Sequence, residues 1–157
     1  MIDPRRKAAA LAFAVNMHEI ATLARTDAEF DDLFQVNVKS ALFLARAVLP
    51  LLEAAKGNVV NITALGGHAP MAGIGAYCAS KAGLVNMTKA MAMEYSRKPI
   101  RINAVAPGGM ITNISNGMTF PSEAEMDLVA RYSGMRGQVE VDDVADLVTL
   151  LASPAGR

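Results

Sequence analysis

Apolar residues, Phe30 and Leu42 among them, recur at every third or fourth position through the first long segment of the chain. This is the period of a helix with one apolar face. Thr26 precedes the segment and Glu29 lies three positions later, which is the spacing of a capping box at a helix start. The pattern therefore predicts a long helix over residues 27–55 that packs through one continuous apolar stripe.

Two short runs rich in β-branched residues follow, at residues 58–63 and 100–105, and both are typical of strands buried in parallel sheets. An alanine- and methionine-rich helix is expected between them, over residues 76–96. Shorter helices are expected at residues 122–132 and 142–152. Strands that alternate with helices are joined by right-handed crossovers. We therefore expect one α/β domain over residues 1–157, with a parallel sheet flanked by helices.

The candidate chemistry lies where the two strands end, because sites in such sheets form at the carboxyl ends of the strands. Between these ends the second long helix begins with Tyr77 and carries Lys81 four positions later, on the same face. An ammonium beside a phenol favours the phenolate and pulls its pKa of about 10 toward neutral. Such a phenol can move a proton at a carbonyl or an alcohol. The alternative is a half-buried tyrosine beside a lysine whose stem covers apolar surface.

Composition narrows the classes of function. With 52% hydrophobic and 19% charged residues among 157, the chain can build one domain with a real core. Fifteen basic and fifteen acidic residues cancel, so neither a nucleic acid nor a membrane is predicted as partner. No uninterrupted apolar run reaches the length of a membrane span. The single cysteine, Cys78, fits a reducing compartment, and a soluble cytoplasmic protein is expected.

Weaker signals at the N-terminus and among the histidines change little. Residues 5–15 have the basic-then-apolar order of a secretion signal, but the run is short and no clear cleavage site follows it. Residues 8–15 fit a helix or a strand equally. His18 and His68 do not form a metal-ligand spacing with the acidic residues. Neither export nor a metal site is predicted.

Several short motifs occur together between about residues 26 and 153. They are Asn37 within VNV, Asn61-Ile62-Thr63, Tyr77-Cys78-Ala79-Ser80-Lys81, Ile100-Arg101-Ile102-Asn103, and Pro107-Gly108 with Thr112. In this combination the chain resembles the C-terminal catalytic part of a short-chain dehydrogenase/reductase. The resemblance implies that Tyr77 is the acid/base, that Lys81 lowers its pKa and holds the nicotinamide ribose, and that Asn37 anchors a proton-relay water. It also implies contacts to NAD or NADP from Tyr77, Pro107, Gly108 and Thr112.

The chain departs from the family pattern at three features. One lies at its ends, because residues 12–15 stand where the family has an Asn-Asn-Ala-Gly strand end and the chain stops at Arg157, before the family's last strand. The family serine that binds the substrate oxygen lies thirteen residues before the tyrosine, where this chain has Ala64. Thr63 is adjacent, but neighbouring strand residues point to opposite faces, so it substitutes only if the strand end twists. The glycine-rich cofactor loop is not found, because Gly73-Ile74-Gly75 has no third glycine and no strand leads directly into it. We therefore expect a truncated Rossmann-like sheet without the first βαβ units and the last strand.

Two functions of different classes follow from these observations. The first is an oxidoreductase that reduces a ketone or oxidises a secondary alcohol with NAD or NADP, with Tyr77 moving the proton. The second is a non-catalytic relative that survives as an oligomerising or regulatory module. Edges of a short sheet favour association, and the two long helices resemble the dimer-forming pair of the family, so a homo-oligomer is expected. The chain alone is expected to bind NADH or NADPH weakly.

Overall fold

The computed structural model describes residues 26–110, 112, 125–131, 134 and 136–156 of the chain. The predictions for residues 8–15 and for a helix start at Ser122 lie outside these residues. Along the chain the elements are α1 (Asp27–Phe34), η2 (Gln35–Lys39), α2 (Ser40–Ala54), β1 (Asn58–Ile62), η3 (Leu65–Gly67), α3 (Gly75–Glu94), β2 (Arg101–Val105), α4 (Met126–Ala130) and α5 (Val141–Ala152).

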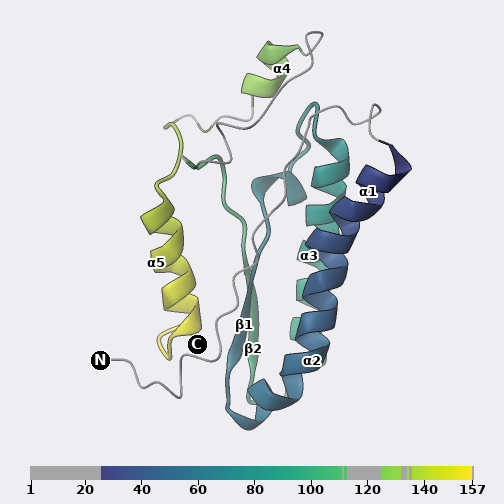
Figure 1. Cartoon of the computed structure of the whole chain (residues 1–157). Coiled ribbons are helices and arrows are strands. Elements are labelled where there is room, and N and C mark those ends of the chain that lie inside the picture. Colours follow the sequence, from purple (N-terminus) through teal and green to yellow (C-terminus); the bar gives the residue numbers. More distant parts are fainter. Residues whose placement is uncertain (1–25, 111, 113–124, 132–133, 135, 157) are drawn as a thin grey trace.

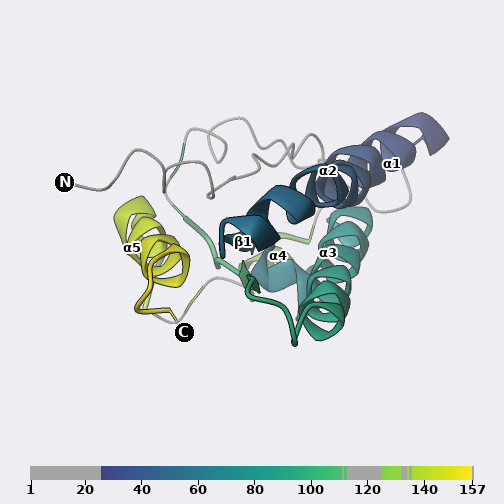
Figure 2. The same ribbon diagram turned by 90° about the horizontal axis from the view of Figure 1, so that it is seen from below.

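In the described part, β1 and β2 form a parallel two-stranded sheet between two layers of helices. The register places Asn58 opposite Arg101 and Ile62 opposite Val105. The helices α2 and α3 cover one face of the strands and α5 lies on the other face (Figures 1 and 2). The predicted α/β fold with a parallel sheet flanked by helices is confirmed.

The first long helix is continuous from α1 to α2, but its middle turn is wider than an α-helix. The predicted capping box at its start is confirmed, because the Thr26 backbone nitrogen donates to the Glu29 carboxylate at 2.7 Å while the Thr26 side chain caps the Glu29 amide. Residues Gln35–Lys39 form a π-turn, which the apolar period does not predict. Such insertions occur frequently at functional sites.

The apolar stripe of this helix is narrower than predicted. Phe30 and Leu42 were placed on it, yet their exposed fractions are 43% and 42%. That part of the prediction is wrong, because these two side chains lie beside the buried stripe and not on it. The buried positions follow one another at intervals of three or four residues: Leu33, Asn37, Ala41, Ala45, Leu49 and Leu52.

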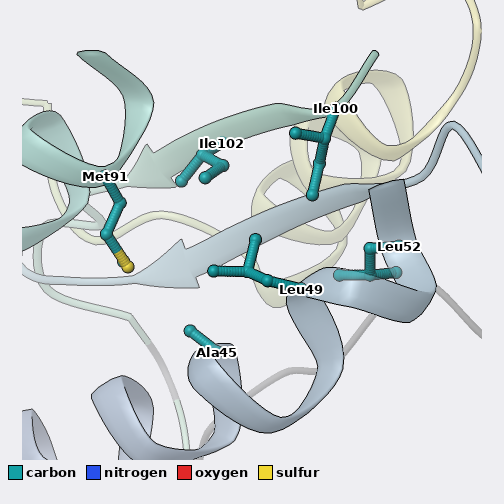
Figure 3. Packing of buried hydrophobic residues seen from close by; sticks show 6 residues of the cluster. All are labelled: Ala45, Leu49, Leu52, Met91, Ile100 and Ile102. Carbon is teal, nitrogen blue, oxygen red and sulfur yellow. The ribbon is translucent and has the colours of Figure 1, made fainter. Parts of the chain in front are cut away.

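The main hydrophobic core fills the space between α2, α3 and the start of β2. Figure 3 shows Leu49 and Leu52 of α2 on one side of the strands, with Ile100 and Ile102 beside them and Met91 reaching in from α3. Each such buried side chain contributes about 1.5–3 kcal/mol to folding. This core fixes α3 against the sheet, and the candidate site lies at the other end of that helix.

A polar latch ties the end of α5 to the starts of both strands. The Arg101 guanidinium donates to the carbonyl oxygens of Leu151, Ser153 and Gly156 at 2.6, 2.9 and 2.8 Å. Asn58 donates to the Ala152 carbonyl oxygen at 3.0 Å. A cation at the C-terminus of a helix also complements its dipole. The latch holds the α5 layer in place.

Only one helical run in the described ranges, Asp27–Ala54, is long and apolar enough to cross a membrane by length and composition. This is weak evidence, since core helices of soluble proteins pass the same test. The run packs its buried face on β1 and α3.

Candidate active site

The carboxyl ends of the two strands are joined, as the sequence predicted. Leu65, just after β1, donates its backbone N–H to the Pro107 carbonyl oxygen at 2.8 Å, and the Thr63 backbone N–H donates to the Val105 carbonyl oxygen at 2.8 Å. The first turns of α3 lie beside this junction and contact η3. The strand ends and the start of α3 therefore form a single site.

Lys81 lies inside this site and is 2% exposed. Its ammonium donates to the Ile62 carbonyl oxygen at the end of β1, at 3.0 Å. Burial lowers the pKa of Lys81 from 10.5 to about 8, because a charge in an apolar environment loses its hydration. The Ile62 carbonyl takes one of three ammonium donors, so the others can serve a ligand.

Tyr77 packs one helical turn before Lys81 and is 9% exposed. It belongs to a buried cluster with Leu33 of α1 and Ala76, and the Lys81 ammonium is 5.8 Å from the centroid of its ring. Burial raises the pKa of Tyr77 to about 12, and the charge of Cys78 adds in the same direction. This direction is opposite to the predicted one, because loss of solvent at the phenol outweighs the ammonium at this distance. Among the described residues the Tyr77 hydroxyl has no hydrogen-bond partner.

Asn37 reaches the same site from the π-turn. It is 5% exposed, and its side-chain nitrogen donates to the Ser80 hydroxyl at 3.0 Å. Ser80 in turn donates to the Tyr77 carbonyl oxygen at 2.7 Å. The structure therefore brings together Tyr77, Lys81 and Asn37, the predicted catalytic residues, while their roles stay predictions.

The position of the family serine carries no hydroxyl, and its neighbour does not replace it. Ala64 is half-buried and packs near Tyr77. Thr63 is 2% exposed, and its hydroxyl donates to the Val105 carbonyl oxygen at 2.9 Å. Because a threonine hydroxyl has one proton, Thr63 cannot also donate to a substrate oxygen in this arrangement.

The predicted cofactor residues after β2 lie at the edge of the site. Pro107 is joined to η3 through its carbonyl oxygen, and a Cβ atom at Gly108 would meet nothing within 4 Å. Thr112 is half-buried. The segment Gly73-Ile74-Gly75 is not a cofactor loop that follows a strand. Gly73 lies in a loop with φ 81°, and Gly75 begins α3, well after β1 ends at Ile62.

The residues present fit the nicotinamide end of a dinucleotide cofactor. The spare donors of the Lys81 ammonium and the phenol of Tyr77 are the groups a ribose hydroxyl can bond. Open space at Gly108 allows a ligand to approach the backbone closely. A helix N-terminus that follows a strand directly, as a pyrophosphate cradle requires, does not occur at the glycines of α3.

Three parts of the site were missed from the sequence. Ser80 lies within the motif that carries Tyr77 and Lys81, and its position three residues after Tyr77 is the available signal. The Ile62 carbonyl is backbone and carries no sequence signal. Gly67 lets η3 approach α3, because a Cβ there would lie 2.9 Å from the carbonyl carbon and oxygen of Lys81.

Comparison with known proteins agrees with this geometry. The family model described as enoyl-(acyl carrier protein) reductase matches residues 7–157. A short-chain type dehydrogenase/reductase of Picea abies is 36% identical over 138 residues, 87% of this chain and 50% of that protein. The 3-oxoacyl-[acyl-carrier-protein] reductase FabG of Rickettsia bellii is 34% identical over 128 residues, 80% of this chain and 51% of that protein. The chain thus spans about half the length of the curated relatives that it matches.

Solved structures show the same fold. A short chain dehydrogenase/reductase family protein superposes with a TM-score of 0.78 at 30% identity, covering 94% of this chain and 60% of that one. A 4-hydroxyisoleucine dehydrogenase complexed with NADH superposes with a TM-score of 0.76 at 27% identity, covering 94% and 62%. A putative 2-deoxy-d-gluconate 3-dehydrogenase from Agrobacterium tumefaciens with bound NADP gives 0.79 at 25% identity, covering 94% and 61%.

Proposed function

This chain belongs to the short-chain dehydrogenase/reductase family, and we propose that it carries the proton-transfer site of an NAD- or NADP-linked oxidoreductase acting on a small ketone or secondary alcohol. The observation that carries the proposal is a phenol without a hydrogen-bond partner among the described residues, one helical turn from a buried ammonium. Among the described residues the buried side-chain atom without a partner is Asn58 Oδ1, so the Tyr77 hydroxyl is not sealed in the interior and is open to solvent. A phenol that is packed through its ring and open at its hydroxyl supports a role toward a ligand.

The protonation state of the phenol defines the part it takes in the reaction. With its pKa raised to about 12, Tyr77 holds its proton at neutral pH. The phenol can then donate that proton to a carbonyl oxygen as the oxygen becomes an alcohol. A bound reduced nicotinamide would supply the hydride to the carbonyl carbon. A phenol that starts protonated acts as the acid in reduction of a ketone, and by reversibility the same group acts as the base in oxidation of an alcohol.

Lys81 and Asn37 support this proton transfer in different ways. The ammonium stands 5.8 Å from the centre of the Tyr77 ring and stabilises negative charge that develops on the phenol when the proton leaves. Asn37 is tied to the helical turn that bears Tyr77 through its hydrogen bond to Ser80. Without a hydroxyl at Ala64, the substrate oxygen has one donor fewer, which by analogy with oxyanion donors lowers the rate by about 10²–10³-fold.

Turnover of a panel of small ketones tests the proposal, with either reduced cofactor at high concentration because weak binding is expected. Tyr77→Phe should lower kcat by about 10²–10⁴-fold, the usual contribution of a general acid. Tyr95→Phe, at the end of α3, is the matched control and should not change kcat. Failure of the wild-type chain to oxidise either cofactor would refute the proposal for this chain. Equal kcat in Tyr77→Phe would assign the proton to another group.

The second candidate is a self-associating module without turnover. Exposed apolar side chains on the outer faces of the long helices favour it: Leu42, Phe43, Leu51 and Met93 are 42–77% exposed. Sedimentation analysis of the wild type and of Phe43→Ser tests it. A monomer at all concentrations would contradict the homo-oligomer. A cytoplasmic location and a fold of residues 1–157 as one domain remain parts of the proposal.

A further inference from the structure

Ser80 is the most deeply buried residue near the site, with an exposed fraction of 0%. Its hydroxyl makes two hydrogen bonds, one from the Asn37 side-chain nitrogen at 3.0 Å and one to the Tyr77 carbonyl oxygen at 2.7 Å. Neither the proton-transfer role of Tyr77 nor that of Lys81 requires this serine by itself. What Ser80 contacts is instead the backbone of one site residue and the side chain of another.

The directions of these bonds are fixed by chemistry. A carbonyl oxygen only accepts, so the single hydroxyl proton of Ser80 must point to Tyr77. The Ser80 oxygen is then left as an acceptor, and the group of Asn37 that faces it must be the NH₂. The carboxamide of Asn37 is therefore held in one orientation, with its oxygen directed away from Ser80. Aligned donors of this kind strengthen one another.

The chain of bonds joins the two pieces of backbone that hold the site. Asn37 stands in the π-turn Gln35–Lys39, and Ser80 and Tyr77 stand in the first turns of α3. The π-turn is locally supported by Ser40, whose hydroxyl donates to the Val36 carbonyl oxygen. Ser80 thus couples the widened turn of one helix to the turn of another that carries the phenol.

We propose that Ser80 is a positioning residue of this site, whose hydroxyl sets the orientation of the Asn37 carboxamide and the distance between the π-turn and the turn of α3 that bears Tyr77. This inference rests on the proposed function in that it names what holds the proton donor in place. Ser80 itself does not touch the substrate. It acts through Asn37 and through the Tyr77 backbone.

A second bridge in the same helix provides a matched control. Asn61 donates to the Thr88 hydroxyl at 2.9 Å, and Thr88 donates to the Leu84 carbonyl oxygen at 2.7 Å. Thr88 is also buried, with an exposed fraction of 2%. The bond pattern is the same as at Ser80, but Thr88 lies eight residues further along α3, about 12 Å at the helical rise. A purely structural role predicts the same consequences for both bridges.

The experiment compares Ser80→Ala with Thr88→Val in the full 157-residue chain, which has three tyrosines. Tyrosines labelled at Cζ with ¹³C are titrated by NMR, and Tyr77→Phe identifies the Tyr77 signal. The ionisable groups beside this phenol are Cys78 and Lys81, and both substitutions leave them in place. Loosening of the turn admits water, so in Ser80→Ala the pKa of Tyr77 should fall from about 12 toward 10.0, and in Thr88→Val it should not move.

Kinetics give the second readout. Ser80→Ala should lower kcat by about 10- to 100-fold, the effect of a misplacement of about 1 Å, with KM nearly unchanged. Ser80→Thr, which keeps the hydroxyl, should restore both kcat and the titration, and Thr88→Val should leave kcat unchanged. If Ser80→Ala does not fold, Ser80→Cys fills the site with a somewhat larger thiol that is a weak donor and acceptor, so both bonds are weakened.

The outcomes separate this inference from the proposed function. A Tyr77 midpoint that is the same in Ser80→Ala and Thr88→Val would overturn the positioning role, whatever the turnover. If the wild type has no turnover, the proposed function fails, and the Tyr77 midpoint still decides whether Ser80 positions the phenol. A shifted midpoint in Ser80→Ala that Ser80→Thr restores would support the role.

Discussion

Lys81→Met tests how much stability the burial of the Lys81 ammonium costs the folded protein. The lysine is 2% exposed, and its single hydrogen bond to a described residue goes to the Ile62 carbonyl oxygen at 3.0 Å. Methionine is unbranched and of similar length, so it can fill the same space without a charge. The substitution therefore removes one desolvated cation and one hydrogen bond.

The magnitude follows from the pKa of the lysine. Burial lowers the pKa of Lys81 from 10.5 to about 8. At about 1.4 kcal/mol for each pH unit, keeping the folded lysine charged costs up to about 3 kcal/mol below pH 8. The lost bond from a charged donor offsets this by about 1.5–3 kcal/mol. At neutral pH the variant should thus lie within about 2 kcal/mol of the wild type.

The pH dependence is the sharper prediction. Between about pH 8 and about pH 10.5 the unfolded lysine binds a proton that the folded one does not, so the stability of the wild type rises with pH. Lys81→Met has no ionisable side chain at this position, so its stability does not gain from this difference in proton binding. The unfolding free energy of the wild type relative to Lys81→Met should therefore increase by up to about 3 kcal/mol across this window.

Urea unfolding followed by circular dichroism at several pH values measures this difference. Lys89→Met, the same change at an exposed position of α3, is the matched control and should give a difference that is independent of pH. Tyr77 is present in every variant, so its own titration cancels to first order. A flat difference for Lys81→Met between pH 7 and pH 10.5 would show that the ammonium is not desolvated in the folded protein.

Three further predictions concern the packing of the fold. Gly67→Ala should lower the free energy of unfolding by about 1–3 kcal/mol, because its Cβ would lie 2.9 Å from the α3 backbone. Gly83→Ala should raise it by about 0.5–1 kcal/mol, because its Cβ would meet a neighbour at an ordinary 3.6 Å within a helix. Urea unfolding tests the pair, and the reverse order would contradict the packing. Arg101→Lys should lower the free energy of unfolding by about 1–3 kcal/mol and speed amide hydrogen exchange in α5, because a lysine cannot donate to three carbonyl oxygens as the guanidinium does. Unchanged exchange would mean that α5 does not depend on the latch. Thr63→Val should lower the free energy of unfolding by about 1 kcal/mol and leave kcat unchanged, since the Thr63 hydroxyl proton is bound to a backbone carbonyl oxygen. A lower kcat would instead indicate that Thr63 donates to the substrate oxygen.

The sequence predicted the elements because their signals are local. The capping box at Thr26 and Glu29, the β-branched strands and the pair Tyr77 and Lys81 all depend on residues within a few positions of one another. The π-turn was not predicted, because an apolar period does not distinguish a widened turn from a regular one. The direction of the Tyr77 pKa was wrong for a related reason. Spacing indicates which charges are near, whereas the solvent lost at a phenol depends on side chains from distant segments such as Leu33.

Several features that ordinarily cost a protein stability lie together at the site. In the described ranges, a π-turn, a buried lysine and a glycine pressed against helix backbone all meet at the start of α3. Each is expected to cost stability, and two hydrogen bonds, from Asn37 to Ser80 and from Asn61 to Thr88, tie α3 to the π-turn and to β1. In a sequence selected for stability alone, such costs would be spread at random or removed. Their convergence on Tyr77 is therefore the physical argument that this end of the sheet is kept for chemistry.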